Sequence, residues 1–480
     1  MFYGNKRERA LVNPRKLIAD LLTAFGAQGI SFLCSCITAL LVPKLLGIEE
    51  FGYWQLFVFY ASYVSFFQLG LNDGVYLQHG GEDRGGIDKS LLGSEFRVGL
   101  CYQLGASLMI GAYGLFFEQD EGRAFVITAA AVYLVISNAT FFLSYIFQAI
   151  NETKISSYST IVNRGFFLIA LVICLLVRVQ DFHIYVIFFI LAQALSLQYC
   201  IWKGKDFVFA KPTTARTAIK ETCRSMRIGI VLTIANVMGM LIIGAARLVI
   251  DLVWGLNAFG EISLSLSIVN FALAFISQAA MVLFPALRSA GGDQERRYYC
   301  QLRDGLSVVM PMALIVYAPL RWLIGLWLPQ YYESLFYLAF LFPVCLFEVQ
   351  SNLTVATFLK VRCEPKALLG VNVAALMLTG VAIAFAVLLV NSPIAVVLAA
   401  LLGVSMRYVI GTIYLGKVYD NWNVKIIICL FAESAVFMAC AYYLPLLQCF
   451  IACVAIIAVH CVVARPEAAR FASEVGKLRN

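Results

Sequence analysis

The stretch LGIEEFG at residues 46–52 recurs, in its spacing of glycine and phenylalanine, as WGLNAFG at residues 254–260. Each stretch lies between two apolar segments of roughly 20 residues or more, the length that a helix needs to cross a bilayer. The two stretches are 208 residues apart, and two more pairs share nearly this offset, Gly80-Gly81 with Gly291-Gly292 and Glu152-Thr153-Lys154 with Glu364-Pro365-Lys366. The sequence therefore predicts an internal duplication.

The composition is that of a membrane protein. Of the 480 residues, 61% are hydrophobic and 13% are charged, and the mean hydropathy is +0.84. An average soluble domain is about 45–50% apolar and about 25% charged. These values exclude a soluble enzyme, a disordered chain and a nucleic-acid-binding protein, in spite of the net charge of +8. The 14 cysteines and three histidines show no zinc-ligand spacing, so no metal site is predicted.

Hydropathy predicts an all-α polytopic membrane protein with about 14 transmembrane helices, arranged as two parallel six-helix repeats followed by a C-terminal helix pair. The last two segments are separated by Pro445 and its neighbours, which predicts a tight helical hairpin. The predicted segments are 17–43, 51–71, 91–117, 123–149, 155–177, 182–202, 228–253, 259–287, 304–327, 332–359, 367–390, 393–415, 425–444 and 447–464.

The basic residues predict the orientation. With the N-terminus inside, the inner connections hold 28 of the 36 Lys and Arg residues and the outer connections hold four. This bias follows the positive-inside rule. The sequence therefore predicts a multi-pass protein of the inner or plasma membrane with both termini in the cytoplasm.

The duplication divides the chain into four parts. We expect an N-terminal six-helix bundle at 1–202, a basic cytoplasmic linker at 203–227, a C-terminal six-helix bundle at 228–415, and an added helix pair with a cytoplasmic tail at 416–480. Parallel repeats of this kind occur in secondary transporters, whose substrate sites lie between the repeats near the middle of the membrane. We therefore expect alternating access by motion of one half against the other.

This pattern resembles the polysaccharide-transporter family, which includes the O-antigen and exopolysaccharide flippases, within the multidrug/oligosaccharidyl-lipid/polysaccharide exporter superfamily. The resemblance rests on the fourteen segments, on residues 46–52 with the Leu-Gly-Leu of 69–71, and on residues 247–260. It implies a flippase that moves a polyprenyl-pyrophosphate-linked oligosaccharide from the inner to the outer leaflet. The family often has an acidic residue directly before the arginine of the seventh span, whereas here Ala245 and Ala246 precede Arg247.

Two arginines are the leading candidates for contact with an anionic substrate, because a charge inside a span is costly and usually faces a cavity or a partner. Arg164, with Asn163 beside it, falls near the midplane of the fifth span, and no acidic residue lies nearby in sequence. Arg247 lies in the outer part of the seventh span. Asp251, one turn later, is either its (i, i+4) partner or a coupling residue.

Other charges inside spans suggest ion pairs. Arg97 and Glu95 at the start of the third span predict a headgroup-level pair, or a vestibule site for pyrophosphate. Arg407 and Glu433 have matching depth on consecutive spans, which predicts a salt bridge that attaches the added helix pair. Glu348, with Gln350 and Asn352, is either a cation-coupling site or the partner of Arg164 or another cation. Asp73 is a further candidate for Na⁺ or proton coupling.

Amide side chains on the first, second, seventh and eighth spans could hydrogen-bond sugar hydroxyls or simply join helices. These candidates for the substrate cavity are Gln28, Asn72, Asn236, Asn270 and Gln278.

The sequence leaves three functions open. None of the Gly-Lys pairs is followed by Ser or Thr, so no P-loop and no ATPase activity is predicted. The flippase is the leading hypothesis, with the lipid-linked glycan and the bilayer as its partners and polymerase or assembly proteins as further ones. The alternatives are a cation-coupled small-molecule exporter of the same superfamily and a membrane-embedded glycosyltransferase. The short outer loops argue against the enzyme.

Overall fold

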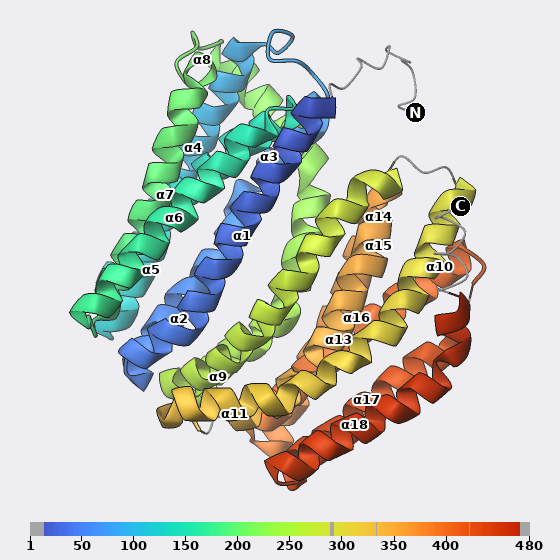
Figure 1. Ribbon diagram of the computed structural model, residues 1–480. Coiled ribbons are helices and arrows are strands. Elements are labelled where there is room, and N and C mark those ends of the chain that lie inside the picture. The colour runs from blue at the N-terminus through green and yellow to red at the C-terminus, as the bar shows by residue number, and fades with distance from the viewer. Residues whose placement is uncertain (1–13, 289–291, 333, 422, 471–480) are drawn as a thin grey trace.

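The computed structural model describes residues 14–288, 292–332, 334–421 and 423–470, and every regular element in these ranges is helical (Figure 1). Eleven of the described helices are long and apolar enough to cross a membrane. A twelfth crossing is formed if two shorter helices that meet at a bend of 40° count as one. The all-helical membrane class is therefore confirmed.

The first half of the chain forms one group of helices, on the left of Figure 1. A 3₁₀ segment, Val64–Gln68, links α2 to α3. The helices are α1 (Pro14–Leu45), α2 (Ile48–Tyr63), α3 (Leu71–His79), α4 (Lys89–Phe116), α5 (Glu121–Ala149), α6 (Thr153–Val177), α7 (Phe182–Lys203) and the short α8 (Lys205–Val208).

The two halves are joined by α9 (Ala215–Arg288), which is 74 residues long. It is bent at Gly255, whose φ of 85° and ψ of −179° are not helical. Glycine adopts this conformation without the steric cost that a side chain would add. In Figure 1, α9 runs from the upper end of the molecule to the lower end and returns. The predicted segments 228–253 and 259–287 both lie in this one element.

The second half contains shorter, interrupted helices. They are α10 (Gly292–Val309), a 3₁₀ segment (Met310–Val316), α11 (Tyr317–Trp327), a 3₁₀ turn (Pro329–Tyr331), α12 (Ser334–Leu341), α13 (Val344–Gln350), a π-helical segment (Ser351–Ala356), α14 (Thr357–Val361), α15 (Pro365–Phe385), a second π-helical segment (Ala386–Val390) and α16 (Pro393–Val418). The predicted hairpin is present as α17 (Val424–Tyr443) and α18 (Leu446–Val463), on the outer right of Figure 1.

The fourteen predicted segments map onto these elements with two differences. Segment 51–71 corresponds to α2, which is only 16 residues long, and the 3₁₀ segment after it. Segments 228–253 and 259–287 correspond to the two helical parts of α9, which meet at a kink at the non-helical Gly255. The count of fourteen and the repeat arrangement therefore remain predictions, as do the domain boundaries. Within the predicted linker 203–227, α8 and the first turns of α9 are helical.

Two ends of the helical bundle can be defined. We call the end with the connections 80–88, 150–152, 204–214 and 362–364 the basic face, and the end with the connections 46–47, 117–120, 178–181 and 391–392 the opposite face. Figure 1 shows that the two halves converge at the opposite face, at the bottom, and diverge toward the basic face.

Contacts at the opposite face connect the halves. The indole Nε1 of Trp327 donates to the Leu40 carbonyl at 2.8 Å, and the Gln330 amide donates to the Pro43 carbonyl at 3.2 Å. The Lys44 ammonium lies 3.2 Å from the centre of the Trp327 ring. These contacts place the end of α1 against α11 and the turn that follows it.

A second close contact joins α3 to the first part of α9, near the basic face. A Cβ atom on Gly74 would lie 1.8 Å from the Ser225 carbonyl oxygen, and one on Gly229 would lie 2.0 Å from the Gly70 carbonyl oxygen. Only glycine permits this approach of the two backbones. The first part of α9 is therefore packed against the first half of the chain.

Candidate functional site

A cavity of about 330 Å³ opens between the first half and the second part of α9. Helices α1, α2, α5, α6, α7 and α9 contribute its lining. The lining residues are Cys34, Ser35, Thr38, Ala39, Trp54, Gln55, Val58, Ala61, Ser62, Tyr133, Arg164, Phe167, Phe189, Ser267 and Asn270. We call it the N-half cavity.

Among the residues that the structure describes, Arg164 is the one charged residue in the lining of the N-half cavity. No carboxylate of the described residues forms an ion pair with its guanidinium. A charge inside a span is normally compensated by a partner or by water in a cavity. Arg164 has no such ionic partner among the described residues, and its planar guanidinium can bind an anion from the cavity.

The N-half cavity touches both halves of the chain. Asn270 on the second part of α9 is exposed to it, and Ser267 one turn earlier accepts a hydrogen bond of 3.2 Å from the Gln55 amide on α2. The predicted candidates Arg164 and Asn270 are thus brought to one cavity.

A second cavity, of about 350 Å³, lies within the second half of the chain. The first part of α9, the interrupted helix of residues 344–361, α15 and α16 enclose it. The lining residues are Asn236, Gly239, Met240, Glu348, Ser351, Asn352, Val355, Ala356, Lys360, Leu368, Asn372 and Arg407. We call it the C-half cavity.

A network of polar side chains crosses the C-half cavity. The Arg407 guanidinium lies 2.6 Å from one carboxylate oxygen of Glu348, and the Asn352 amide donates to the other oxygen at 3.1 Å. The Arg407 Nε also donates to the Ser351 hydroxyl at 2.9 Å. Ser351 and Asn352 belong to the π-helical segment, a local widening that is frequent at functional sites. Glu348 is therefore paired with a cation, as one of the two sequence hypotheses expected, and that cation is Arg407.

Arg247 lies outside both cavity linings. Its guanidinium carbon is 5.0 Å from the centre of the Phe59 ring and 4.9 Å from that of Phe259, and it donates to the Ser263 hydroxyl at 2.8 Å. Of the two alternatives given for Asp251, the pairing with Arg247 is wrong. Although the spacing (i, i+4) allows the contact, Arg247 turns between two aromatic rings, a favourable environment for a guanidinium.

Two of the predicted coupling residues are held by neighbours. Asp251 forms an ion pair with Arg123 at 2.6 Å, between α9 and the start of α5. Asp73 on α3 accepts hydrogen bonds from the Gln68 amide and the Thr233 hydroxyl. Both carboxylates are buried and serve contacts between helices.

The expected ion pair between Arg97 and Glu95 is also absent. Arg97 donates to the carbonyl oxygens of Val208 and Ala210, at 2.9 Å and 2.5 Å. Glu95 instead accepts a hydrogen bond of 3.1 Å from the Ser225 hydroxyl on α9. Neighbours two positions apart on a helix point in different directions, so proximity in sequence did not produce contact.

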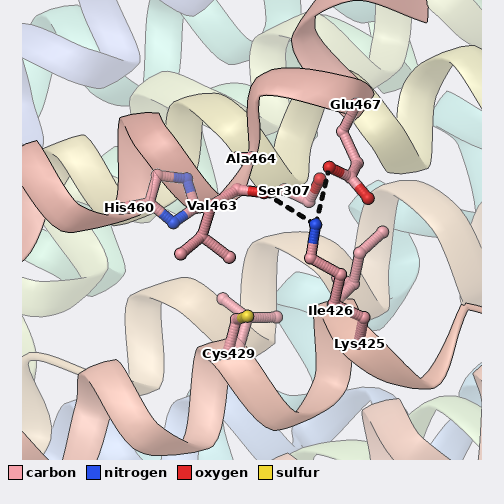
Figure 2. A pocket seen from close by; sticks show the side chains of 9 residues that line it. Ser307, Lys425, Ile426, Cys429, His460, Val463, Ala464 and Glu467 are labelled. Atoms are coloured by element: carbon pink, nitrogen blue, oxygen red, sulfur yellow. Dashed lines mark hydrogen bonds and ion pairs between the residues drawn. The ribbon is translucent and has the colours of Figure 1, made fainter.

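The expected bridge between Arg407 and Glu433 is wrong as well. Glu433 on α17 pairs with the Nδ1 atom of His460 on α18 at 2.6 Å. His460 also lines a small cavity of about 20 Å³ between the added pair and the bundle, shown in Figure 2. There the Lys425 ammonium donates to the Val463 carbonyl at 2.6 Å and lies 3.3 Å from the Glu467 carboxylate. These polar contacts hold α17 and α18 together.

Of the remaining amide candidates, Asn163, Asn72 and Gln28 are not in the lining of either cavity. Asn163 donates to the Gln193 side chain on α7, and Asn72 is buried at the start of α3. Gln28 is half-buried on α1. Gln278 lies outside the residues whose side chains the structure describes. Asn236 lines the C-half cavity and is exposed there.

Several lining residues were not singled out by sequence. Ser35, Thr38 and Ser62 are ordinary small polar residues in apolar spans, and no pattern distinguishes them. Asn372 could have been found, because it is the one amide in the apolar segment 367–390. Its side chain donates to the Ala235 carbonyl at 2.7 Å at the edge of the C-half cavity.

The arrangement of helices defines the fold of the MOP superfamily. A MATE family multidrug resistance transporter in an inward-facing conformation matches 83% of this chain and 98% of its own, with a TM-score of 0.64 and 12% identity. The match with the lipid II flippase MurJ in an inward closed conformation covers 94% of this chain and 99% of the flippase, with a TM-score of 0.63 and 12% identity. The match with a MATE transporter in an outward-facing conformation covers 84% of this chain and 94% of the transporter, with a TM-score of 0.56 and 12% identity.

The chain belongs to the polysaccharide biosynthesis protein family, whose family model matches residues 17–290. This match covers more than half of the sequence and includes α9 through its return toward the basic face. A sequence comparison with curated proteins finds no match. The family resemblance stated from the sequence is thereby confirmed.

Proposed function

We propose that this protein is a flippase that moves a polyprenyl-pyrophosphate-linked oligosaccharide from the inner to the outer leaflet. Membership of the polysaccharide biosynthesis family and the fold shared with a lipid II flippase support this class of substrate. Transport would not require an ATPase within the chain, and the substrate would move by alternating access of the two halves.

The observation that favours a phosphorylated substrate most directly is the state of Arg164. Its guanidinium lines a cavity that both halves of the chain border, and no described carboxylate neutralises it. A pyrophosphate would supply the missing negative charge, and the planar guanidinium can bind two of its oxygens at once. Arg164 is therefore the proposed anion-binding residue of the N-half cavity, with Asn270 beside it.

The closed opposite face supports alternating access. Side chains of α11 and the turn after it bind the end of α1 there, whereas the halves diverge toward the basic face. The higher TM-score with the inward-facing than with the outward-facing transporter agrees with this arrangement. We infer that the basic face is cytoplasmic, as the positive-inside rule predicts, with both termini on that side of an inner or plasma membrane.

The setting implied by this function is polysaccharide assembly, of O-antigen or exopolysaccharide type. The polymerase or other assembly proteins that use the flipped glycan are then partners on the outer side. The proposal needs no metal or organic cofactor.

The second candidate is a cation-coupled exporter of small molecules, which the match with MATE transporters favours. Such an exporter needs an acidic residue that binds and releases a cation. The carboxylates of Asp73, Asp251 and Glu348 are all engaged by protein donors. This observation makes the exporter the weaker of the two proposals.

The test is a leaflet-access assay with a fluorescent polyprenyl-pyrophosphate sugar in proteoliposomes that contain the purified protein and no ATP. The label should become accessible in both leaflets with the wild type and remain in one leaflet with Arg164→Ala. Arg164→Lys should retain part of the rate, because a lysine keeps the charge but loses the bidentate geometry. An exposed amide outside both cavities, changed in Gln198→Ala, provides the matched control.

Two results would contradict the proposal. One is leaflet exchange that Arg164→Ala leaves at the wild-type rate. The other is export of a cationic dye, driven by a Na⁺ or proton gradient, without movement of the lipid-linked sugar. The second result would favour the small-molecule exporter.

A further inference from the structure

The two cavities differ in charge. The N-half cavity has one arginine and no described carboxylate in its lining. In the C-half cavity the Arg407 guanidinium is matched by the Glu348 carboxylate 2.6 Å away. The remaining cation of that lining, Lys360, is exposed and stands about 18 Å further along the same helical run, toward the basic face. The part of the C-half cavity around Glu348 and Arg407 is therefore polar but carries no net charge.

The C-half cavity also offers both donors and acceptors. Asn236 and Asn352 are exposed there, and no described hydrogen bond engages Asn236. The NH1 group of Arg407 likewise has no described partner, whereas Nε and NH2 are bonded. Glu348 adds acceptor oxygens. A neutral molecule with many hydroxyl groups, each able to donate and to accept, suits this lining.

The lining is held in place by close packing around Gly239. A Cβ atom there would lie 3.1 Å from the Asn372 amide nitrogen and 3.3 Å from the Arg407 NH1 group. The Asn372 amide is fixed by the Ala235 carbonyl, and the Arg407 Nε is fixed by Ser351. The polar groups of the cavity are thus positioned by the protein before any ligand arrives.

We propose that the C-half cavity binds the sugar portion of the substrate, while the N-half cavity binds its pyrophosphate. This inference rests on the proposed function. Because Arg407 and Glu348 neutralise each other, the pair offers no net positive charge to a phosphate, whereas the Glu348 oxygens accept hydrogen bonds from sugar hydroxyls. The ligand of the C-half cavity is a neutral oligosaccharide, bound through Asn236, Asn352, Glu348 and the free NH1 group of Arg407.

The experiment uses two probes with the purified full-length protein in lipid nanodiscs. One probe is bare polyprenyl pyrophosphate. The other is the free oligosaccharide that mild acid releases from the lipid-linked glycans of the membranes in which the protein is native. Affinity for each probe is measured for the wild type, Asn352→Ala, Asn236→Ala, Arg164→Gln and the control Gln198→Ala.

Asn352→Ala and Asn236→Ala should each weaken oligosaccharide binding about tenfold, the loss expected for one or two hydrogen bonds. Binding of the bare carrier should change by less than about twofold in both. Arg164→Gln should show the reverse pattern. Asn352 and Asn236 are exposed and lie on different helices, so a folding defect in one variant leaves the other as the test.

The two proposals fail in different ways. Oligosaccharide binding that neither asparagine variant weakens, or no oligosaccharide binding by a wild type that binds the carrier, overturns the assignment of the C-half cavity and leaves the flippase proposal standing. Carrier binding that is absent from the wild type or unchanged in Arg164→Gln counts against the proposed function itself.

Discussion

Arg123 and Asp251 form two hydrogen bonds, of 2.8 Å and 2.6 Å, between the start of α5 and the part of α9 just before Gly255. The pair lies near the opposite face and is unequally buried, because the Asp251 side chain is 1% exposed and the Arg123 side chain is 23% exposed. The Arg123 guanidinium can therefore reach water if Asp251 is replaced. The Asp251 carboxylate cannot reach water if Arg123 is replaced.

This inequality predicts an asymmetric effect of mutation. Arg123→Gln leaves a buried carboxylate without its cation and should cost about 3–5 kcal/mol of stability. Asp251→Asn leaves a guanidinium that can turn toward water and should cost less, about 1–2 kcal/mol. The double variant should be more stable than Arg123→Gln alone. Unfolding temperatures of the three proteins in one detergent test this order, and equal losses would contradict it.

Substitutions of Arg164 and Arg247 should have different effects in a transport assay. Arg164→Met removes the charge of the N-half cavity and should abolish leaflet exchange. Arg247→Met replaces a cation that lies between two phenylalanine rings by an apolar chain, and transport should fall by less than about threefold. Its thermal stability should also be retained, because an apolar residue of similar volume often replaces a buried charge without loss. Loss of transport in well-folded Arg247→Met would restore Arg247 as a substrate contact.

Coupling to Na⁺ through Glu348 is not expected. Arg407 already neutralises this carboxylate in the C-half cavity, so a second cation would have to displace a guanidinium. Exchange of the lipid-linked sugar should proceed at the same rate when choline replaces Na⁺ on both sides of the membrane. If Na⁺ accelerates exchange in the wild type and not in Glu348→Gln, the prediction is wrong.

The contact between α3 and α9 should tolerate no side chain. Gly74→Ala places a methyl group 1.8 Å from a backbone oxygen of α9, so the helices must separate, and we expect a loss of about 3 kcal/mol or more. Gly380→Ala on α15 is the matched control, since no atom lies within 4 Å of its added methyl group. The control should gain up to about 1 kcal/mol from helix propensity. The yield of folded monomer in size-exclusion chromatography distinguishes the two.

A charged cluster at the basic face predicts a dependence on pH. Burial raises the pKa of Asp206, but hydrogen bonds from Arg84 and Lys89 outweigh it and lower the pKa to about 2. The unfolded value is about 3.9, so the stabilisation is complete above about pH 4 and is lost as the pH falls toward 2. Asp206→Asn should be about 1 kcal/mol less stable than the wild type at pH 7, and this difference should shrink below pH 4. A difference that is constant across this range would contradict the assignment.

The sequence predicted the helical class and the isolated arginine, but not the ion-pair partners. Arg164 was identified because the surrounding span contains no acid, and this property does not depend on how helices are rotated. The partner of Arg407 depends on rotation. The sequence paired Arg407 with Glu433 by their matching depth, whereas the packing of α16 against α13 brings Glu348 to Arg407. Likewise, the glycine at position 255 did not reveal that the two helical parts of α9 meet at this one residue without a longer loop.

The contacts that close the opposite face, which we call the clasp, join side chains of one half to main-chain carbonyls of the other. Trp327 and Gln330 donate hydrogen bonds to the main-chain carbonyl oxygens of Leu40 and Pro43. These oxygens would be present whatever residues occupied positions 40 and 43. Sequence drift at the end of α1 therefore leaves the clasp intact, except through Lys44. In the course of evolution, changes that retune how readily this end opens should accumulate at positions 327 and 330 rather than at their partners.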